Sequence, residues 1–248
     1  MKSYKDVNNQ LNAIKLRGVA ANLDELISEA EAQRQSYLSF LNQVLGSELE
    51  DRAERKYKRS ITAAHFPVRK TIEEFKFGRV KGITKSRISQ LLDFSWIDKK
   101  ENVLFFGPPG LGKTHLSIGL GFEAIEKGYD VCFERVSNLM KILKTAEIQR
   151  TSGFRLNKII KSDLLIIDEI GYTPIERREA NLFFNLISEM YEKQSIIITS
   201  NKSFTVWAEM LGDEVMTTAM LDRLLHHANI FTLAGESYRL LNKEVKTV

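Results

Sequence analysis

A glycine-rich loop between a short apolar run and a helix constrains this chain more than any other feature. It reads Gly107-Pro-Pro-Gly-Leu-Gly-Lys-Thr-His115 and contains the phosphate-binding pattern G-x-x-x-x-G-K-T. Glycines let backbone N–H groups approach a phosphate, where a Cβ would obstruct them. An apolar, β-prone run at residues 103–106 precedes the loop, and a helix predicted over residues 116–127 follows it. The order of strand, loop and helix predicts a P-loop that binds a nucleoside triphosphate.

Two side chains of this loop supply charge and a metal ligand. Lys113 would neutralise the β- and γ-phosphate oxygens, and the Thr114 hydroxyl would bind Mg²⁺ at the start of the helix. The positive end of the helix dipole adds to the anion site. The expected nucleotide contacts are Gly107, Pro108, Pro109, Gly110, Leu111, Gly112, Lys113, Thr114 and His115.

A second apolar run ends in two adjacent carboxylates. It reads Asp163-Leu-Leu-Ile-Ile-Asp-Glu169, which is a Walker B pattern. Asp168 would hold Mg²⁺ through water, and Glu169 would polarise the attacking water. Because a Mg²⁺ site alone needs only the first acid, the pair predicts hydrolysis as well as binding.

A third apolar run, residues 195–199, ends in Ser200 and Asn201. The carboxyl ends of parallel strands meet at one ligand crevice, so Asn201 could reach the γ-phosphate or the attacking water. Taken alone, the pair is equally compatible with an ordinary turn. After the two Walker elements, it is interpreted as a polar sensor of the nucleotide.

From about Leu16 to Arg239 the chain resembles the AAA+ ATPases of the IstB/DnaC clade, and within it the IstB-like transposition helper proteins. The narrowest signals are Leu221-Asp-Arg-Leu-Leu-His-His227 and Gly235-Glu-Ser-Tyr-Arg239, which accompany the Walker elements, Ile198-Thr-Ser-Asn201 and Trp207. The resemblance implies ATP and Mg²⁺ as ligands and ATP hydrolysis as the activity. It assigns Asn201 to sensor 1, Arg223 to the arginine finger offered to a neighbouring subunit, and Arg239 to sensor 2. A guanidinium suits such roles because it is permanently charged and offers a planar fork of donors.

Three segments are expected along the chain: a helical N-terminal domain over residues 1–66, a basic connector over 67–100 and the ATPase domain over 101–248. Residues 7–64 show helix-compatible apolar spacing with no strand signal. Strands are expected over residues 103–106, 131–133, 164–167 and 196–199. Their alternation with helices predicts an α/β fold, a P-loop NTPase with a parallel sheet flanked by helices.

Positive charge is concentrated in the first 100 residues, which hold 19 Lys and Arg against 13 Asp and Glu. Clustered cations are what contact with a DNA backbone requires, although a solvated basic helix fits equally well. A second group of cations lies between the second predicted strand and the Walker B run, in a region that resembles the DNA-tracking part of the clade. The candidate DNA contacts are Arg52, Arg55, Lys56, Lys58, Arg59, Lys141, Lys144, Arg150, Arg155, Lys158, Arg177 and Arg178.

Composition excludes several other classes of protein. Cys132 is the only cysteine, so a disulfide framework and a cysteine-based zinc site are not available. No stretch approaches about 18 uninterrupted apolar residues, and no apolar signal region follows the N-terminus, so a cytoplasmic protein without membrane contact is expected. His226 and His227 are expected on a helix, where neighbours point about 100° apart, so they are not expected to share a metal.

Together these patterns predict an ATP-dependent AAA+ ATPase that forms homo-oligomers on double-stranded DNA, shares its ATP sites between subunits and assists a transposase encoded nearby. A replicative helicase loader of the DnaC/DnaI type is the main alternative, because it shares the ATPase core. A non-catalytic, ATP-gated filament subunit is a third possibility, and the intact Glu169 argues against it.

Overall fold

The computed structural model describes residues 3–171 and 175–238 of the 248-residue chain. The chain forms two compact units, Met1–Arg59 and Ser60–Val248. The boundary falls within the long helix α3 (Tyr37–Ala64). The division at residues 66 and 100 stays a prediction.

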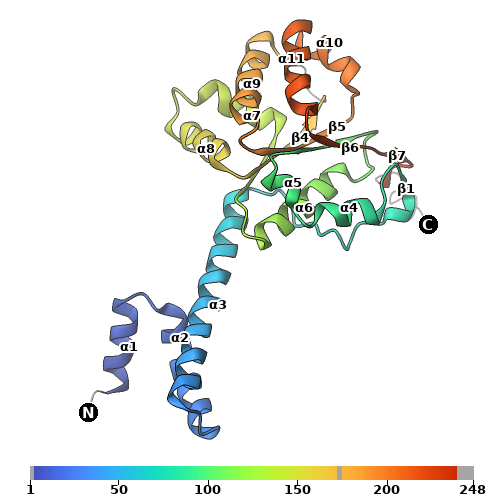
Figure 1. The fold of residues 1–248 in the computed structure, drawn as a ribbon. Coiled ribbons are helices and arrows are strands. Elements are labelled where there is room, and N and C mark those ends of the chain that lie inside the picture. Colours follow the sequence, from blue (N-terminus) through green and yellow to red (C-terminus); the bar gives the residue numbers. More distant parts are fainter. Residues whose placement is uncertain (1–2, 172–174, 239–248) are drawn as a thin grey trace, which may run out of the picture. The chain divides into compact units, whose positions relative to one another are not determined.

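The N-terminal unit is helical, as the apolar spacing predicts (Figure 1). Helix α1 (Tyr4–Ala13) begins at a capping box formed by Ser3 and Asp6, and α2 (Arg17–Ala32) buries Val19, Leu23 and Leu26 in a small core. The first part of α3 belongs to the same unit. Few apolar side chains are buried here, so individual polar contacts matter for its stability.

One such contact is the buried carboxylate of Glu48 on α3. Its Oε2 accepts a hydrogen bond of 2.8 Å from the N–H of Gly18, and its Oε1 accepts one of 2.7 Å from Nε of Arg52. Burial acts to raise the pKa of Glu48, but Arg52 and the backbone N–H groups of Gly18 and Val19 outweigh it and hold the pKa below its usual value. The charged form therefore stabilises the fold above the ordinary glutamate pKa.

We expect Glu48→Gln to destabilise the N-terminal unit by about 1–3 kcal/mol, because a neutral amide leaves the donors of Gly18 and Arg52 poorly satisfied. The difference from the wild type should shrink as the pH falls through the folded pKa of Glu48, since the wild-type carboxyl is then also neutral. Urea unfolding followed at several pH values measures this. Glu50→Gln, at an exposed position on the same helix, is the control, and equal stability of the two variants at pH 7 would contradict the prediction.

The second unit contains a parallel sheet of five strands. Their order is β3-β4-β5-β2-β6, so β5 lies between the P-loop strand β2 and the Walker B strand β4. The four predicted strands are mostly buried and apolar, as expected for strands covered on both faces. The bounds are β2 (Asn102–Phe106), β3 (Val131–Arg135), β4 (Leu164–Ile170), β5 (Ser195–Ser200) and β6 (Ala228–Thr232). The expected α/β fold with a parallel sheet is confirmed, while β6, a partly exposed edge strand, was not predicted.

Helices cover both faces of this sheet (Figure 1). On one face lie α4 (Lys85–Leu91), α5 (Ser95–Asp98) and α6 (Lys113–Glu126). On the other lie α7 (Val136–Thr145), α8 (Arg150–Lys161), α9 (Arg177–Met190), α10 (Trp207–Leu211) and α11 (Glu214–Leu225). Alternate strand residues such as Leu165, Ile167 and Ile198 pack against this second group. The carboxyl ends of β2, β4 and β5 are thereby held in fixed positions.

The segment before the sheet packs along α6 toward the P-loop. Phe66 stacks on Phe122 of α6 with ring centroids 4.6 Å apart, and a Cβ at Gly119 would lie 2.7 Å from Cδ1 of Ile72. After the short helix η1 (Phe77–Arg79), strand β1 (Val80–Lys81) pairs antiparallel with β7 (Ala234–Gly235). Phe75, before β1, and Ser237, after β7, both lie against the P-loop glycines.

Candidate nucleotide site

A cavity of about 570 Å³ lies at the P-loop. The P-loop and α6 form one wall, the carboxyl ends of β4 and β5 another, and the segments around η1 and after β7 enclose the rest. The lining residues are Val68, Lys70, Glu74, Phe75, Lys76, Arg79, Gly110, Gly112, Lys113, Thr114, His115, Ile118, Glu169, Thr199 and Tyr238. Of the predicted nucleotide contacts, Gly110, Gly112, Lys113, Thr114 and His115 line the cavity, and of the Walker B pair Glu169 does. Gly107, Pro108, Pro109, Leu111 and Asp168 do not line it.

The P-loop glycines meet two separate demands. Gly110 and Gly112 have φ values of 83° and 84°, in the left-handed region that favours glycine. A Cβ on Gly110 would lie 2.0 Å from Oγ of Ser237, and one on Gly112 would lie 2.6 Å from the ring of Phe75. The loop thus turns its backbone toward the cavity and also packs closely against its neighbours. Helix α6 begins directly after Gly112, so its first N–H groups are available to an anion.

Lys113 lies inside this loop. Its Nζ donates hydrogen bonds of 2.6 Å to the carbonyl of Gly107 and 2.8 Å to that of Pro108. The side chain is 6% exposed and lines the cavity. Its charge is therefore held where the β- and γ-phosphates of a bound nucleotide are expected.

The Walker B carboxylate Asp168 is fully buried beside the P-loop. Its Oδ1 accepts hydrogen bonds from Oγ1 of Thr114 at 2.7 Å and from Oγ1 of Thr199 at 2.6 Å. Its Oδ2 is also buried, and it has no hydrogen-bond partner among the described residues. A buried carboxylate oxygen left in this state is costly unless a further ligand satisfies it. A carboxylate next to a threonine hydroxyl matches the oxygen ligands of Mg²⁺, so these residues fit the metal.

Glu169 leaves the regular strand geometry. Its φ is 67°, unusual for a residue with a side chain, and the pairing of β4 with β5 shifts between Ile167 and Ile170. Its N–H donates to Oγ1 of Thr199 at 2.9 Å, and its Oε2 lies 3.6 Å from Nε of Arg135. The shift turns Glu169 out of the buried strand, and its side chain lines the cavity.

Thr199 is a site residue that the sequence analysis missed. Its hydroxyl accepts from the N–H of Glu169 and donates to Asp168, so one side chain positions both Walker B acids. The sequence showed only a polar residue at the end of an apolar run. Its role depends on β5 pairing directly with β4, which no local pattern reveals.

We expect Thr199→Val to lower ATP turnover by about 10- to 100-fold, the usual cost of losing a residue that orients a metal ligand. Valine has nearly the shape of threonine but no hydroxyl. The N–H of Glu169 would lose its acceptor, and Asp168 would lose one of its donors. Phosphate release across a Mg²⁺ titration measures this, since weakened Mg²⁺ binding shows as a higher half-saturating concentration. Thr199→Ser keeps the hydroxyl and should retain most turnover; a serine variant as impaired as valine would assign the loss to packing.

Asn201 follows β5 and lies beside the segment after Walker B. A Cβ on Gly171 would lie 2.7 Å from Oδ1 of Asn201. This Oδ1 is buried and has no hydrogen-bond partner in the part of the chain that the structure describes. Its position near the end of β4 is compatible with the expected sensor role, which stays a prediction.

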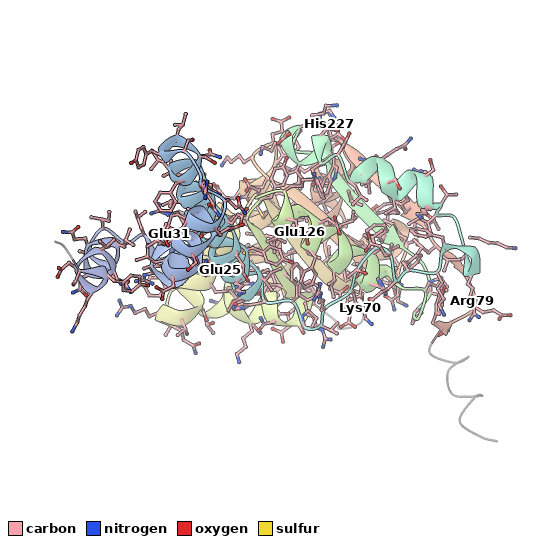
Figure 2. All side chains as sticks on the ribbon, turned by 90° about the horizontal axis from the view of Figure 1, so that it is seen from below. Glu25, Glu31, Lys70, Arg79, Glu126 and His227 are labelled. Atoms are coloured by element: carbon pink, nitrogen blue, oxygen red, sulfur yellow. The ribbon has the colours of Figure 1, made fainter. Side chains whose placement is uncertain are left out.

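Arg223 lies on α11, apart from the residues that line the cavity. Its Nη1 donates to the carbonyl of Ala219 at 2.7 Å, and its guanidinium lies 5.1 Å from the ring centroid of Phe184. His227, two residues past the end of α11, lies on the other side of the unit from Lys70 and Arg79 of the cavity (Figure 2). Arg223 does not line the cavity of its own subunit, and its role as an arginine finger stays a prediction. The sensor 2 candidate, Arg239, lies outside the described residues.

Tyr238 is hydrogen-bonded to two segments of the cavity wall. The N–H of Tyr238 donates to the carbonyl of Gly110 at 3.1 Å, and its hydroxyl donates to the carbonyl of Lys76 at 2.6 Å. Tyr238 therefore joins the P-loop to the segment around η1, a role that the sequence signalled only through the Gly235-Glu-Ser-Tyr motif. His115 also lines the cavity, and its Nε2 lies at hydrogen-bond distance, 2.7 Å, from the carbonyl oxygen of Thr71.

The candidate DNA contacts fall into different environments. Lys56, Arg59, Lys141, Arg150, Lys158 and Arg178 are exposed. Several others are ion-paired, as Arg52 and Arg55 with Glu48, Arg55 also with Asp51, Lys58 with Glu54, Lys144 with Glu179, and Arg177 with Asp213.

Arg155 departs from the expectation of a DNA contact. Its side chain is 10% exposed, its Nε lies 2.6 Å from Glu134, and its Nη1 donates to the carbonyl of Ala63 at 2.9 Å. The buried carboxylate of Glu134 needs this cation, so Arg155 holds α8 in place instead of facing solvent.

His226 and His227 do not point apart as two neighbours on a helix would, contrary to expectation. Helix α11 ends at Leu225, and the rings of His226 and His227 lie 4.0 Å apart. One potential ligand atom of each, with one of Glu192, lies within 4.8 Å of the others. All three side chains are exposed, and the Tyr191 hydroxyl lies 2.9 Å from Nδ1 of His226. The cluster takes no part in the nucleotide cavity.

No helix in the described part of the chain is both long and apolar enough to cross a membrane.

The chain is similar in sequence to known ATP-binding proteins. A family model for IstB-like ATP binding proteins matches residues 9–246. The chain is 40% identical over 240 residues to an ATP-binding protein of insertion sequence IS5376 from Geobacillus stearothermophilus, covering 97% of this chain and 96% of that protein. It is 40% identical over 233 residues to an ATP-binding protein of insertion sequence IS21 from Pseudomonas aeruginosa, covering 94% of this chain and 88% of that protein.

Among solved structures, the crystal structure of DnaI matches with a TM-score of 0.56 at 18% sequence identity, covering 67% of this chain and 92% of that one. At this identity the likeness concerns the AAA+ fold alone. The family model matches nearly the whole chain, and two insertion-sequence proteins are 40% identical to it. The chain therefore belongs to the family of IstB-like ATP-binding proteins.

Proposed function

We propose that this protein hydrolyses ATP, assembles into oligomers on double-stranded DNA and assists a transposase encoded by the same insertion sequence. The observation that carries the proposal is the arrangement of Thr114, Asp168 and Glu169 around one cavity, fixed by Thr199. It supports hydrolysis because it pairs a metal-binding carboxylate with a second carboxylate at the cavity wall. Relatives in insertion sequences support the transposase as partner.

In the proposed reaction, Lys113 and the first N–H groups of α6 hold the phosphates. Thr114 and Asp168 would hold Mg²⁺, which would supply positive charge to offset that of the phosphates. Glu169 orients a water for in-line attack on the γ-phosphorus and accepts its proton as the bond to the β-phosphate oxygen breaks, giving ADP and phosphate. Asn201 would help to position that water.

Assembly is part of the proposed mechanism. Arg223 lies away from its own cavity, so a neighbouring subunit would supply the guanidinium that completes each site. ATP binding would then favour oligomers, and hydrolysis would permit release. The exposed cations of α3 and of the α7–α8 region would contact the DNA backbone. Little sequence preference is expected, because residues 3–171 and 175–238 show no base-reading element.

The test is ATP-dependent binding to matched duplex and single-stranded DNA at two salt concentrations, by fluorescence anisotropy with size analysis of the complex. Tight, salt-sensitive duplex binding in large assemblies is expected, whereas preference for single strands in small complexes would instead support a helicase loader. Lys113→Ala is the matched variant. If it assembles on DNA as well as the wild type in ATP, the proposed coupling between nucleotide and assembly is wrong.

A further inference from the structure

The solvent face of α8 combines cations with one exposed aromatic ring. Arg150, Phe154 and Lys158 follow one another at four-residue intervals, so they lie in one row along the helix. Phe154 is 62% exposed, and α8 contains no Asp or Glu. Asn157 and Lys161 are also exposed. A merely solvated basic helix has no need of a bare phenyl ring at the centre of its charged face.

The opposite face of α8 fixes the direction in which this row points. Ile159 is fully buried in the core that α8 shares with α7. Arg155, next to Phe154 in sequence, bonds to Glu134 and to the carbonyls of Ala63 and Phe133. These contacts prevent α8 from rotating to bury Phe154. The ring is therefore held in solvent by the fold.

The ring is also supported from one side. The guanidinium carbon of Arg150 lies 5.2 Å from the ring centroid of Phe154, within the range of a cation–π contact. Just before α8, Ile148 is 86% exposed. The row thus presents an ordered aromatic wedge with a cation one helical turn to either side. Arg150 and Lys158 are eight residues apart, so their positions differ by about 12 Å along the helix axis.

We propose that α8 binds duplex DNA and inserts Phe154 between two base pairs from the minor groove. Arg150 and Lys158 would contact phosphates on the two sides of this groove, which is about 6 Å wide, and Phe154 would enter between them. Apolar wedges of this kind unstack a base step and kink the duplex. This inference rests on the proposed DNA binding and adds the mode of contact and the residue responsible.

A side chain that acts as a wedge favours DNA sequences that are easily deformed. Pyrimidine–purine steps such as TA unstack most easily, so they should be preferred at the kink although no side chain reads their edges. We expect the bound nucleic acid to be a duplex. Phe154 needs two stacked base pairs to enter between, and the cations on its two sides can contact the phosphates of both strands. Simple stacking on single strands is an outcome that the experiment below distinguishes.

The experiment uses the full-length protein with ATP and a duplex carrying 2-aminopurine at a central TA step and a fluorophore pair at its ends. Anisotropy reports binding, 2-aminopurine emission reports unstacking, and energy transfer reports bending. The wild type should raise both the emission and the energy transfer. At protein concentrations that saturate the duplex, Phe154→Ala should lose both signals. Its affinity for the duplex should fall by about fivefold or less, because only one aromatic contact is removed. Phe154→Trp should retain both.

Two controls separate this inference from the proposed function. Arg150→Ala with Lys158→Ala should weaken binding at all sequences and reduce its salt dependence. Unchanged binding of a fluorescent ATP analogue by Phe154→Ala verifies its fold. A Phe154→Ala protein that binds, unstacks and bends the duplex as the wild type does overturns the wedge alone. A wild type that binds no duplex overturns the proposed DNA binding, and a Phe154-dependent signal found only with single strands overturns the duplex mode.

Discussion

Glu169→Gln should reduce ATP turnover by about a thousandfold and leave ATP binding intact, because an amide cannot accept the proton of the attacking water. The side chain lines the cavity but makes none of the hydrogen bonds that hold Asp168 or Lys113 in place. Its backbone N–H, which bonds to Thr199, is unchanged by the substitution. The loss should therefore appear in the chemical step alone.

Phosphate release under saturating ATP and Mg²⁺ measures turnover, and a fluorescent ATP analogue measures binding. Glu126→Gln, at an exposed position at the end of α6, is the control for removing a glutamate from the same unit. If Glu169→Gln kept more than about a tenth of wild-type turnover, another group would have to act as the base, and the role given to Walker B would fail. A matching loss of ATP binding would point to a structural role instead.

The contrast between Asp168 and Thr199 shows how much of this site could be read from the sequence. Asp168 follows an apolar run in a short motif, so its position at a strand end could be predicted locally. Thr199 acts on it through the pairing of β4 with β5, and the shift in that pairing sets the left-handed backbone of Glu169. The contact of Thr199 and the conformation of Glu169 both depend on which strands pair in the sheet. The order of strands along the sequence does not reveal this pairing.

Charge shows the same limit. Arg155 and Lys158 are indistinguishable as cations in one basic segment, yet the first is buried against Glu134 and the second is exposed. The two residues are three apart on α8, so the helical periodicity makes them neighbours. Only the packing against β3 and Ala63 decides that Arg155 is the covered one. Prediction was therefore secure for the four apolar strands, whose signals are local, and weak for side chains whose partners come from distant segments.

Arg223→Ala should also reduce turnover about a thousandfold, the lower range for an arginine finger, provided that Arg223 acts on a neighbouring subunit. In its own subunit the guanidinium stacks on Phe184 and bonds to Ala219, away from the cavity residues. A role in the same subunit would need α11 to move substantially. The mutant should bind ATP normally, because each cavity keeps its own P-loop and Asp168. Thermal unfolding checks that loss of the Phe184 contact has not destabilised the fold, and Arg223→Lys, which keeps the charge without the planar fork, should recover only part of the activity.

Mixing two inactive variants distinguishes action between subunits from action within one. A subunit with Arg223→Ala retains Glu169, and a subunit with Glu169→Gln retains Arg223. Where the second type lies next to the first in the correct direction, one site regains both groups, so an equal mixture should recover about a quarter of wild-type turnover if the subunits assemble at random in a head-to-tail ring or spiral. If Arg223 served its own cavity, no combination would place both groups at one site and the mixture would stay inactive. Recovery that depends on DNA as well as ATP would further indicate that assembly on the duplex completes the catalytic site.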